Sequence, residues 1–399
     1  MNRRTHPRTP PPRRGTQRNT TLIATISNTP RLAAWGSTTA IAQLLGTEPS
    51  GGPEAELWFG AHPASPARMV DDLSPQGHVT LDEWFADSRE TDGDSTATWL
   101  PFLLKVLAAA KPLSLQAHPT AAQAREGYDR ENAAGVPLDA PQRNYPDPHP
   151  KPELIVALSE RFDALVGFRP ISESKAIFEE LGEPEAAARL DDLPVFVAWL
   201  LSRGAGVDEL VERVSRHDFT DPETLRLVRN LADDYPGDPG IVLALTLNRV
   251  TLRPGDALYV PAGTIHAYLE GLGIELMTAS DNVLRGGLTV KHVDVPELLT
   301  VLDCTPGAAP RLTPQRVTDT HTVYHQQGTA PRLDLATGDA SINASGPVIA
   351  LCVDGHFDLR GQHSTTTMGR GEARLISADE SPLTVTGAGS VYFASAVRD

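Results

Sequence analysis

The chain has little that would support a disulfide-stabilised or membrane-embedded fold. Its 399 residues include only two cysteines, Cys304 and Cys352, which lie far apart and form no Cys-x-x-Cys pair. This argues against a thiolate zinc site and favours a reducing compartment, so we expect a cytoplasmic protein. No apolar run approaches the ~20 residues that a membrane helix needs. The length indicates two or three domains.

Lysine is scarce, and acidic residues outnumber basic ones. Five lysines stand against thirty arginines, and the formal net charge is −16. Residues 1–20 carry six arginines and no acid, so the remainder carries −22. A body of that charge does not attract nucleic acid through its overall field, and we expect neither a nucleic-acid nor a membrane partner. We expect residues 1–21 to be a disordered basic leader or a start-site artefact, with a nucleic-acid-binding arm as the alternative.

The pattern of apolar residues divides the chain into β-rich and helical parts. Residues 22–170 read as short, mostly β segments with loops, and β patterns return after the turn cluster YPGDPG at 235–240. Residues 171–235 show three-to-four-residue apolar spacing, which indicates amphipathic helices. Residues 306–399 are rich in Thr, Val and Gly with frequent turns, typical of an all-β domain. The sequence therefore predicts a mainly β protein with an inserted α-helical domain.

Polar residues alternate with apolar ones in LSLQAH, residues 113–118. In a strand, Gln116 and His118 share one face and stand roughly 6.6 Å apart along the chain. Both can therefore converge on one metal ion. A strand with a plain solvated face is the alternative for this stretch alone.

A second polar pair enters an apolar strand in HPKPELIVAL, residues 149–158, where Lys151 and Glu153 share a face. A carboxylate in such a strand is costly unless it is paired or bound to metal. Glu153 is therefore a candidate ligand, and a simple Lys151–Glu153 ion pair is the alternative.

The strongest local signal is RPGDALYVPAGTIHAYLEG, residues 253–271. A tight turn and an apolar strand precede Pro-x-Gly-x-x-His, and the glycine permits a bend that directs His266 inward. Tyr268 shares its face. This order is typical of the second metal motif of the cupin β-barrels, whereas a hydrogen-bonded core histidine is the alternative.

Charged residues crowd around glycines in the following segment, residues 273–295. It contains Glu275, Asp281, Arg285 and Lys291. A guanidinium fork and an ammonium group are the donors that suit a phosphate, so this segment is a candidate anion site. A solvated loop is the alternative.

Taken together, SLQAHP, HPKPEL, PAGTIHAYLEG and SDNVLRGGLTVKHVDV resemble the type I mannose-6-phosphate isomerases (phosphomannose isomerases). ELWFGAHP and AWGSTTAIAQLLG nearer the N-terminus add to the resemblance, which runs from about residue 24 to the end. The segment 280–295 departs from the family pattern in two places: Gly286-Gly287 replaces the frequent Ala-Gly, and Val290-Lys291 replaces the usual Pro-Lys.

The resemblance implies one Zn²⁺ per chain and a sugar phosphate as the small-molecule partner. Its implied zinc ligands are Gln116, His118, Glu153 and His266. Its implied active-site residues are Arg285, Glu275, Lys151 and Tyr268 for catalysis and Trp35, Ser114, Asp281 and Lys291 for substrate binding. A ligand set with one negative charge leaves zinc a good Lewis acid, although Mn, Fe or Co would also suit these atoms.

The implied reaction interconverts mannose 6-phosphate and fructose 6-phosphate through a cis-enediol. Glu275, Lys151 or a hydroxide on the metal could move the proton, and Arg285 could hold either the phosphate or the enediolate. The resemblance also implies cupin-type jelly-roll β-domains, one formed by residues 22–170 with 236–305 and bearing the zinc, and a metal-free one at 306–399. A faint internal repeat within this chain, RPGDALYVPAGTIHAY against GRGEARLISADESPLT, sets Gly371 against Gly255 and Pro382 against His266, so the second segment has no imidazole there. We expect a monomer, with an oligomer left open.

Three other functions are compatible with parts of this pattern. An isomerase of an unphosphorylated or different aldose would differ in its dependence on phosphate. A cupin oxygenase would normally carry His-x-His where this chain has Gln116-Ala117-His118. A non-catalytic sugar-binding cupin would have no need of every proposed ligand together with Arg285.

Overall fold

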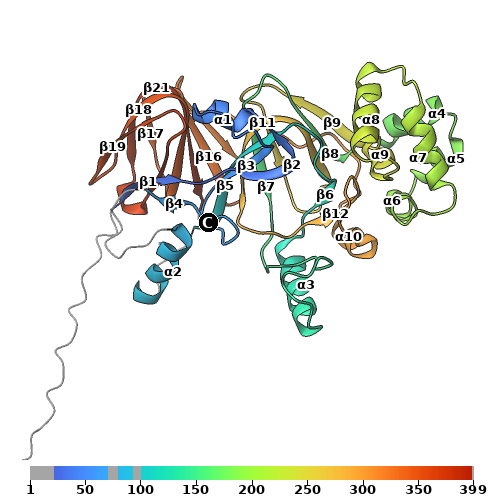
Figure 1. The fold of residues 1–399 in the computed structure, drawn as a ribbon, viewed down its shortest axis with the longest axis horizontal. Helices are drawn as coiled ribbons and strands as arrows, with labels where there is room; N and C mark the ends of the chain where they lie inside the picture. Colours follow the sequence, from blue (N-terminus) through green and yellow to red (C-terminus); the bar gives the residue numbers. More distant parts are fainter. Residues whose placement is uncertain (1–21, 71–79, 93–99, 398–399) are drawn as a thin grey trace, which may run out of the picture.

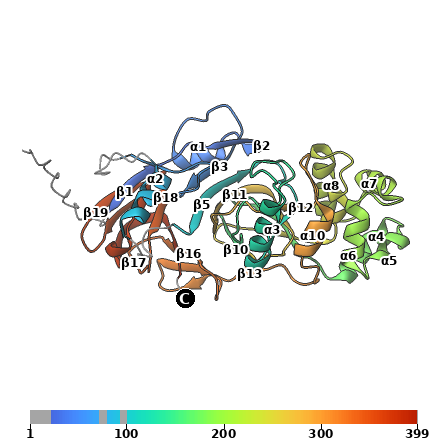
Figure 2. The same cartoon turned by 90° about the horizontal axis from the view of Figure 1, so that it is seen from below.

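The computed structural model describes residues 22–70, 80–92 and 100–397, and the expected leader over residues 1–21 lies outside that part. Figures 1 and 2 show three regions in a row: a β region built largely from C-terminal residues, a central β region, and a block of helices at the far end. The central region therefore contacts both of the others. Among the described residues no helix has the length and apolar character needed to cross a membrane.

The first β region is a ten-strand antiparallel sheet within the described residues. Its first strand, β1, pairs with β20, so a strand from the beginning of the chain lies in the sheet of the C-terminal residues. The expected division of the chain at residue 306 stays a prediction. The strands are β1 (Ile23–Ser27), β4 (Arg68–Met69), β14 (Gln315–Arg316), β15 (His321–His325), β16 (Pro331–Ala336), β17 (Ala340–Ile342), β18 (Val348–Arg360), β19 (Thr365–Gly369), β20 (Ala373–Ile376) and β21 (Leu383–Ala396).

The second β region joins eleven strands within the same described part of the chain. They are β2 (Arg31–Ser37), β3 (Glu54–Phe59), β5 (Phe102–Ala109), β6 (Gln116–Ala117), β7 (Glu153–Ala157), β8 (Phe162–Phe168), β9 (Leu247–Leu252), β10 (Ala257–Val260), β11 (His266–Thr278), β12 (Leu284–Arg285) and β13 (Arg311–Leu312). The short β13 pairs with β10, so a few residues beyond 306 also belong to this region.

The long strand β11 connects the two halves of the central region. Its first half pairs with β6 and β8, and its second half pairs with β5 and β7. Between them Gly271 adopts φ 133, and a Cβ there would stand 2.7 Å from the Phe162 ring. Only glycine fits this close approach, so β11 bends and contributes His266 and Glu275 to the same interior.

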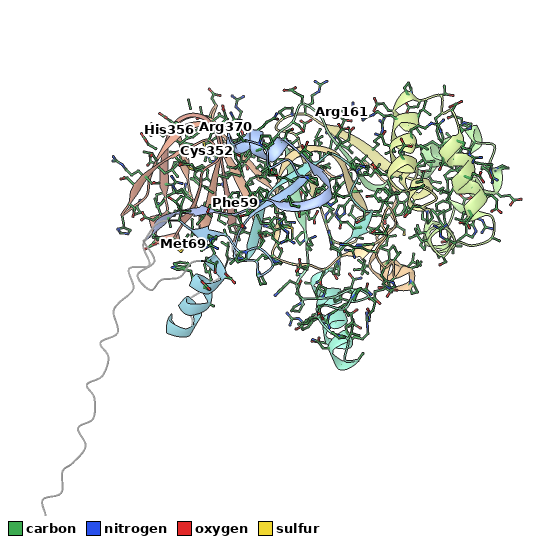
Figure 3. The ribbon with its side chains drawn as sticks, in the orientation of Figure 1. Phe59, Met69, Arg161, Cys352, His356 and Arg370 are labelled. Atoms are coloured by element: carbon green, nitrogen blue, oxygen red, sulfur yellow. The ribbon has the colours of Figure 1, made fainter. Side chains whose placement is uncertain are left out.

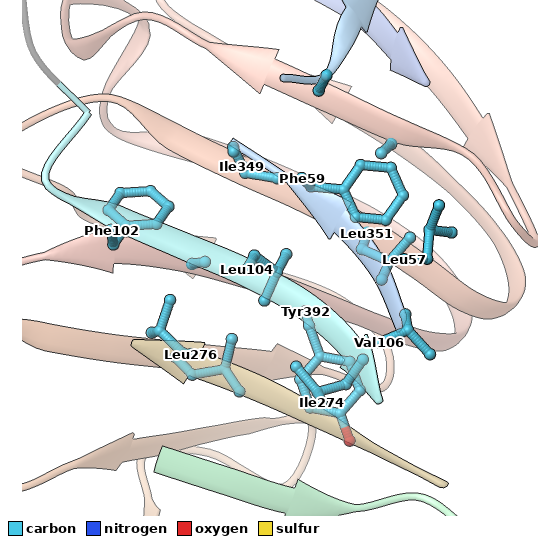
Figure 4. Packing of buried hydrophobic residues seen from close by; sticks show 14 of the residues in the cluster. Leu57, Phe59, Phe102, Leu104, Val106, Ile274, Leu276, Ile349, Leu351 and Tyr392 are labelled. Atoms are coloured by element: carbon cyan, nitrogen blue, oxygen red, sulfur yellow. The ribbon is translucent and has the colours of Figure 1, made fainter. Parts of the chain in front are cut away.

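The main hydrophobic core lies between the two β regions. Figure 4 shows Leu104 of β5 and Leu276 of β11 facing Ile349 and Leu351 of β18. Each of these four side chains is at most 1% exposed. The strand β5, FLLKVLAA, reads as a nearly continuous apolar run because both of its faces are covered.

The helical block follows the predicted amphipathic pattern closely. It consists of α4 (Ile171–Glu180), α5 (Pro184–Arg189), α6 (Leu193–Leu201), α7 (Val207–Arg216), α8 (Pro222–Asp234) and α9 (Gly240–Ala244). Five of these lie within the residues expected to be helical, whereas α9 was expected to be β. Its five residues form a fully buried apolar run, in which periodicity does not distinguish helix from strand.

Four further helices interrupt the parts expected to be mostly β. They are α1 (Ala40–Leu45), α2 (Leu81–Asp92), α3 (Ala121–Ala133) and α10 (Val295–Val301), and a 3-10 turn covers Ala378–Glu380. Two of them carry start signals in the sequence. Thr120 and Gln123 form a capping box before α3, and Asp294 caps α10 ahead of a proline in its first turn. The predicted fold class, mainly β with a helical insertion, is confirmed.

Charged side chains fasten the helical block to the central sheet. Arg161, labelled in Figure 3, lies 2.8 Å from the Asp163 carboxylate and 2.7 Å from Glu223 of α8. Arg249 of β9 also reaches Glu223, at 2.6 Å. Because Asp163 is almost fully buried, this network is not a purely exposed set of ion pairs, and it fixes the orientation of α8 against the central sheet.

We expect Leu104→Ala to lower the free energy of unfolding by about 2–5 kcal/mol, because it removes a fully buried side chain and leaves a cavity between the two β regions. Val317→Ala, at a position 50% exposed, should change it by less than about 0.5 kcal/mol. Denaturant titration of both variants measures the difference, and equal midpoints would contradict the placement of the core.

Candidate active site

Three potential metal ligands meet inside the central β region. One atom from each of His118, Glu153 and His266 lies within 4.8 Å of the others, and all three residues are buried. Glu153 opens β7, His266 opens β11, and His118 directly follows β6. The pairing of Gln116 with His266 brings the start of β11 beside β6, the strand that leads into His118. Residues distant in sequence thus reach one point through sheet register.

Both imidazoles are oriented for metal binding. His118 Nδ1 donates to the Asn282 carbonyl at 2.7 Å, and His266 Nδ1 donates to the Thr264 carbonyl at 2.9 Å. A carbonyl can only accept, so each proton resides on Nδ1 and each Nε2 presents a lone pair. The two buried Nε2 atoms lie 3.0 and 3.3 Å from the Glu153 oxygens without hydrogen-bond geometry. Such unsatisfied buried atoms suit a bound cation.

A fixed loop supports the His118 contact. Asn282 is fully buried, and its side-chain amide donates to the carbonyls of His149 at 2.7 Å and Asp147 at 2.8 Å. The Asn282 carbonyl that accepts from His118 is therefore held in place. These hydrogen bonds hold the segment 147–149 beside the segment 280–282, a proximity that the sequence did not predict.

The charge balance of the three residues matches a metal site. Burial acts to raise the pKa of Glu153, but Lys151, 3.1 Å away, and His118 hold it well below its usual range. Burial and the charge of Lys151 lower the pKa of His118 to about 4. Tyr268 donates to Glu153 at 3.2 Å, and burial raises the pKa of its hydroxyl. The cluster thus offers a neutral His118 nitrogen and an anionic Glu153 oxygen at neutral pH.

Two adjoining cavities open beside this cluster. The first has a volume of about 180 Å³ and the second about 420 Å³, and Glu56, Leu113 and Gln116 line both. The first is also lined by Lys151, Glu153, Tyr268, Glu275 and Asp281. The second is also lined by Trp35, Ser114, Arg285 and Lys291. Ten of the residues singled out from the sequence therefore line one bipartite space, with Gln116 at its junction, whereas His118 and His266 line neither cavity and are buried behind Glu153.

A buried ion-pair cluster forms one wall of the first cavity. Lys105 of β5 stands directly opposite Glu275 of β11 in the sheet, with its Nζ 3.1 Å from Glu275 and 3.2 Å from Glu56. The same ammonium lies 4.8 Å above the Trp58 ring. These contacts satisfy a charge that would otherwise be costly to bury.

Sequence reasoning missed Lys105, Glu56 and Trp58 as site residues. The available signal was a lone lysine inside the apolar strand FLLKVLAA, one of only five lysines in the chain. Glu56 and Trp58 alternate within ELWF, so that both face the same side of β3. A lysine amid an apolar strand implies a buried carboxylate partner, but sequence does not say which carboxylate.

Glu275 has the electrostatic properties of a proton-transfer group. Burial raises its pKa to about 7, although the charge of Lys105 acts to lower it. For Lys105, burial acts to lower the pKa, but Glu275 and Glu56 outweigh this and raise it, so the ammonium stays charged. A carboxyl that titrates near neutrality can both accept and return a proton.

Asp281 lies at the rim of the first cavity beside His62. Its carboxylate is 3.3 Å from His62 Nε2, and this contact lowers the pKa of Asp281. The Asp281 backbone N–H donates to Asp147 at 2.7 Å, which ties the rim to the loop supporting His118. The motif GAHP, which contains His62, gave no indication from sequence that this histidine lies at the site.

The second cavity is suited to an anion. Within the part of the chain that the structure describes, neither Arg285 nor Lys291 has a carboxylate at salt-bridge distance. Burial lowers the pKa of Arg285, and burial with the nearby charge of Arg285 lowers that of Lys291. Two adjacent cations without a protein counter-ion favour binding of a small anion such as a phosphate.

Comparisons with known proteins agree with this geometry. Residues 23–171 match the family model for the phosphomannose isomerase type I catalytic domain. The chain is 37% identical to the mannose-6-phosphate isomerase of Escherichia coli (strain K12) over 389 residues, covering 92% of this chain and 97% of that protein. The mannose-6-phosphate isomerase of Homo sapiens is 35% identical over 316 residues, covering 69% and 72%.

Solved structures show the same architecture. A zinc-bound mannose 6-phosphate isomerase superposes with a TM-score of 0.83 at 32% identity, covering 94% of this chain and all of that one (100%). The apo form from Salmonella typhimurium gives a TM-score of 0.82 at 32% identity, covering 94% and 99%. The expected cupin-type fold with its helical insertion is confirmed.

We expect His118→Ala and His266→Ala each to reduce bound zinc per chain by more than about tenfold, because each removes one ligand from a site without thiolates. His356→Ala, an exposed histidine labelled in Figure 3, should leave the zinc content unchanged. Metal analysis of the purified variants measures this. Full zinc content in either site variant would contradict the ligand assignment.

Proposed function

The chain belongs to the type I phosphomannose isomerases and is a zinc-dependent enzyme that interconverts mannose 6-phosphate and fructose 6-phosphate, and we propose that its site residues divide this task between two ends of one cavity. The observation that carries this proposal is the bipartite cavity itself. A buried His–Glu–His cluster and a carboxyl with pKa about 7 line or adjoin one end, and two unpaired cations line the other.

Gln116, His118, Glu153 and His266 hold the zinc. The three buried ligand atoms of the cluster, the unsatisfied Nε2 atoms beside Glu153 and the position of Gln116 at the cavity junction support this assignment. Within the described residues the Gln116 side-chain amide makes no hydrogen bond, so its oxygen is free to bind. Zinc held there would supply a Lewis acid that polarises oxygens of the open-chain sugar.

Glu275 moves the proton between C1 and C2. In its ionised form it takes the proton from C2, and the electrons of the broken C–H bond form the C1=C2 double bond of a cis-enediol while O1 gains a proton. Return of the proton from Glu275 to C1, with loss of the proton on O2, gives the ketose. A pKa of about 7 supports this role, since the carboxyl exchanges protons readily near neutral pH.

The neighbouring groups position Glu275 and the ligands. Lys105 stays protonated 3.1 Å from Glu275 and fixes the orientation of the carboxylate. Lys151 and Tyr268 both contact Glu153, at 3.1 and 3.2 Å, which favours a role in holding that ligand rather than in moving the substrate proton. Asp281 lies at the rim, where it can reach sugar hydroxyls.

Arg285 and Lys291 bind the phosphate, and Trp35 and Ser114 contact the substrate in the same cavity. All four residues line the second cavity, whose two cations lack protein counter-ions among the described residues. The proximity of Arg285 to Lys291 favours the phosphate over the enediolate as the partner of the guanidinium.

The enzyme is further proposed to be a cytoplasmic monomer whose domains divide near residue 306. Burial raises the pKa of both free cysteines to about 11, which keeps the thiols protonated and unreactive. Residues 306–399 bind no metal, since Pro382 has no ligand atom where His266 stands in the corresponding segment.

We expect the purified enzyme to interconvert mannose 6-phosphate and fructose 6-phosphate, to lose more than about 90% of this activity on chelation and to regain it with added zinc. Unphosphorylated mannose should react with a kcat/KM at least about a hundredfold lower, because the charge-assisted bonds of the phosphate end are lost. A coupled spectrophotometric assay of both sugars tests this. Equal turnover of mannose would favour the alternative, an isomerase of unphosphorylated aldoses.

Glu275→Gln should reduce kcat by about 10²–10⁴-fold, since the amide cannot accept a proton. In the wild type, kcat/KM should fall as the pH drops below about 7, because protonation of Glu275 removes the base.

Lys105→Met removes the adjacent cation that lowers the pKa of Glu275, so the acid limb of the kcat/KM profile should move upward by roughly one to three pH units.

Lys175→Met is the matched control for the loss of a lysine, because Lys175 pairs with Asp191 on the surface of the helical block. Its pH profile should coincide with that of the wild type. An acid limb that keeps its position in Lys105→Met, at normal zinc content, would show that Glu275 is not the titrating base.

A further inference from the structure

The turn that ends the longest helix of the insertion lies against the substrate cavity. Residues Tyr235-Pro-Gly-Asp238-Pro connect α8 to α9, and Tyr235 lines the second cavity together with Arg285 and Lys291. The sequence marked this stretch only as a turn cluster, and the reaction described above assigns it no part. Its contacts, however, reach both the segment that precedes Ser114 and the loop that carries Arg285 and Lys291.

One end of the turn contacts the wall that carries Ser114 and Gln116. The Tyr235 hydroxyl donates to the Pro112 carbonyl at 2.6 Å. Beside it, Asp234 forms a 2.6 Å ion pair with Lys111. Both contacts fall immediately before the segment that leads into the site.

The other end of the turn contacts the loop that carries the two cations. One oxygen of the Asp238 carboxylate accepts from the Gly240 N–H at 2.7 Å, and the other accepts from the Thr289 N–H at 3.3 Å. Thr289 lies between Arg285 and Lys291, and it lines the same cavity. The carboxylate therefore bridges the insertion and the cationic loop.

The cationic loop has an unusual backbone conformation next to this contact. Leu288 adopts φ 52, a left-handed conformation that a leucine keeps only when its surroundings hold it. Its side chain is fully buried in the hydrophobic core of the helical block. A Cβ at Gly240 would stand 2.7 Å from the Leu288 nitrogen, so the two segments touch through their backbones.

We propose that Asp238 is a positioning residue for phosphate recognition, through which the helical insertion fixes the loop that carries Arg285 and Lys291. The inference rests on the proposed function of that cavity end. By holding the Thr289 N–H, the carboxylate sets where the two cations stand relative to Ser114 and Gln116. The insertion thus contributes to affinity for the phosphate without touching the reacting carbons.

The test compares Asp238→Asn and Asp238→Ala with the control Asp233→Asn, which makes the same charge change at an exposed position of α8. Alanine loses both accepted hydrogen bonds. Asparagine keeps one acceptor and turns an NH₂ group toward the other N–H, so one bond is lost whichever way the amide is placed. The measurements are kcat and KM for mannose 6-phosphate, the inhibition constant of inorganic phosphate, zinc content and Tm.

We expect KM and the phosphate inhibition constant to rise together, about tenfold in Asp238→Ala and about threefold in Asp238→Asn, with kcat within about twofold of wild type and unchanged zinc. Simple removal of a negative charge near an anion site would instead tighten phosphate binding and lower both constants. A merely structural residue would lower Tm or the active fraction without moving either constant. If Asp238→Ala does not fold, Asp238→Asn decides.

Either unchanged or lowered constants in a folded, zinc-loaded Asp238 variant would overturn the positioning role while leaving the proposed function intact. If inorganic phosphate does not compete with mannose 6-phosphate in the wild type, the anion end itself is wrong, and the role of Asp238 falls with it. A rise of both constants in Asp233→Asn equal to that in Asp238→Asn would also overturn the proposal.

Discussion

The whole arrangement depends on keeping one carboxylate ionised in a place that excludes water. Glu153 is almost fully buried, and its charge is stabilised by the Lys151 ammonium and the Tyr268 hydroxyl, while two imidazole nitrogens stand beside it ready for a shared cation. Those partners come from three separate segments. The register of β11 against its neighbours, and the loop that supports His118, are therefore constraints that the site places on the fold.

A second buried charge cluster lies next to the first, and its carboxyl has a raised pKa where that of Glu153 is lowered. Burial raises the pKa of Glu275 to about 7, while Lys105 remains charged beside it. Glu153 is thus kept ionised and Glu275 is kept exchangeable, although both are carboxylates on the same sheet. The bend of β11 at Gly271 brings the strand halves carrying His266 and Glu275 to the same interior, as the proposed roles of ligand and base require.

The helical insertion gains a role in this picture beyond covering the sheet. Its core encloses Leu288, its ion pairs fasten α8 to the central strands, and its terminal turn reaches both walls of the cavity. The metal end is built by strands, whereas the anion end is built where strands meet helices. Under the proposed assignment, affinity for the phosphate and chemistry at the carbons would depend on different elements of the fold.

The sequence by itself determined the local periodicities and the chemical types of the ligands. Alternation in LSLQAH, the order Pro-x-Gly-x-x-His and the helical spacing of residues 171–235 are short-range properties, and the helices appear where that spacing places them. The resemblance of the motifs then indicated the family. Tertiary structure alone decided that Lys105 lies opposite Glu275, that the Asn282 carbonyl orients His118 and that Asp238 reaches Thr289. These contacts join residues far apart in the chain, and strand register and long-range packing, which no local pattern encodes, set which partners meet.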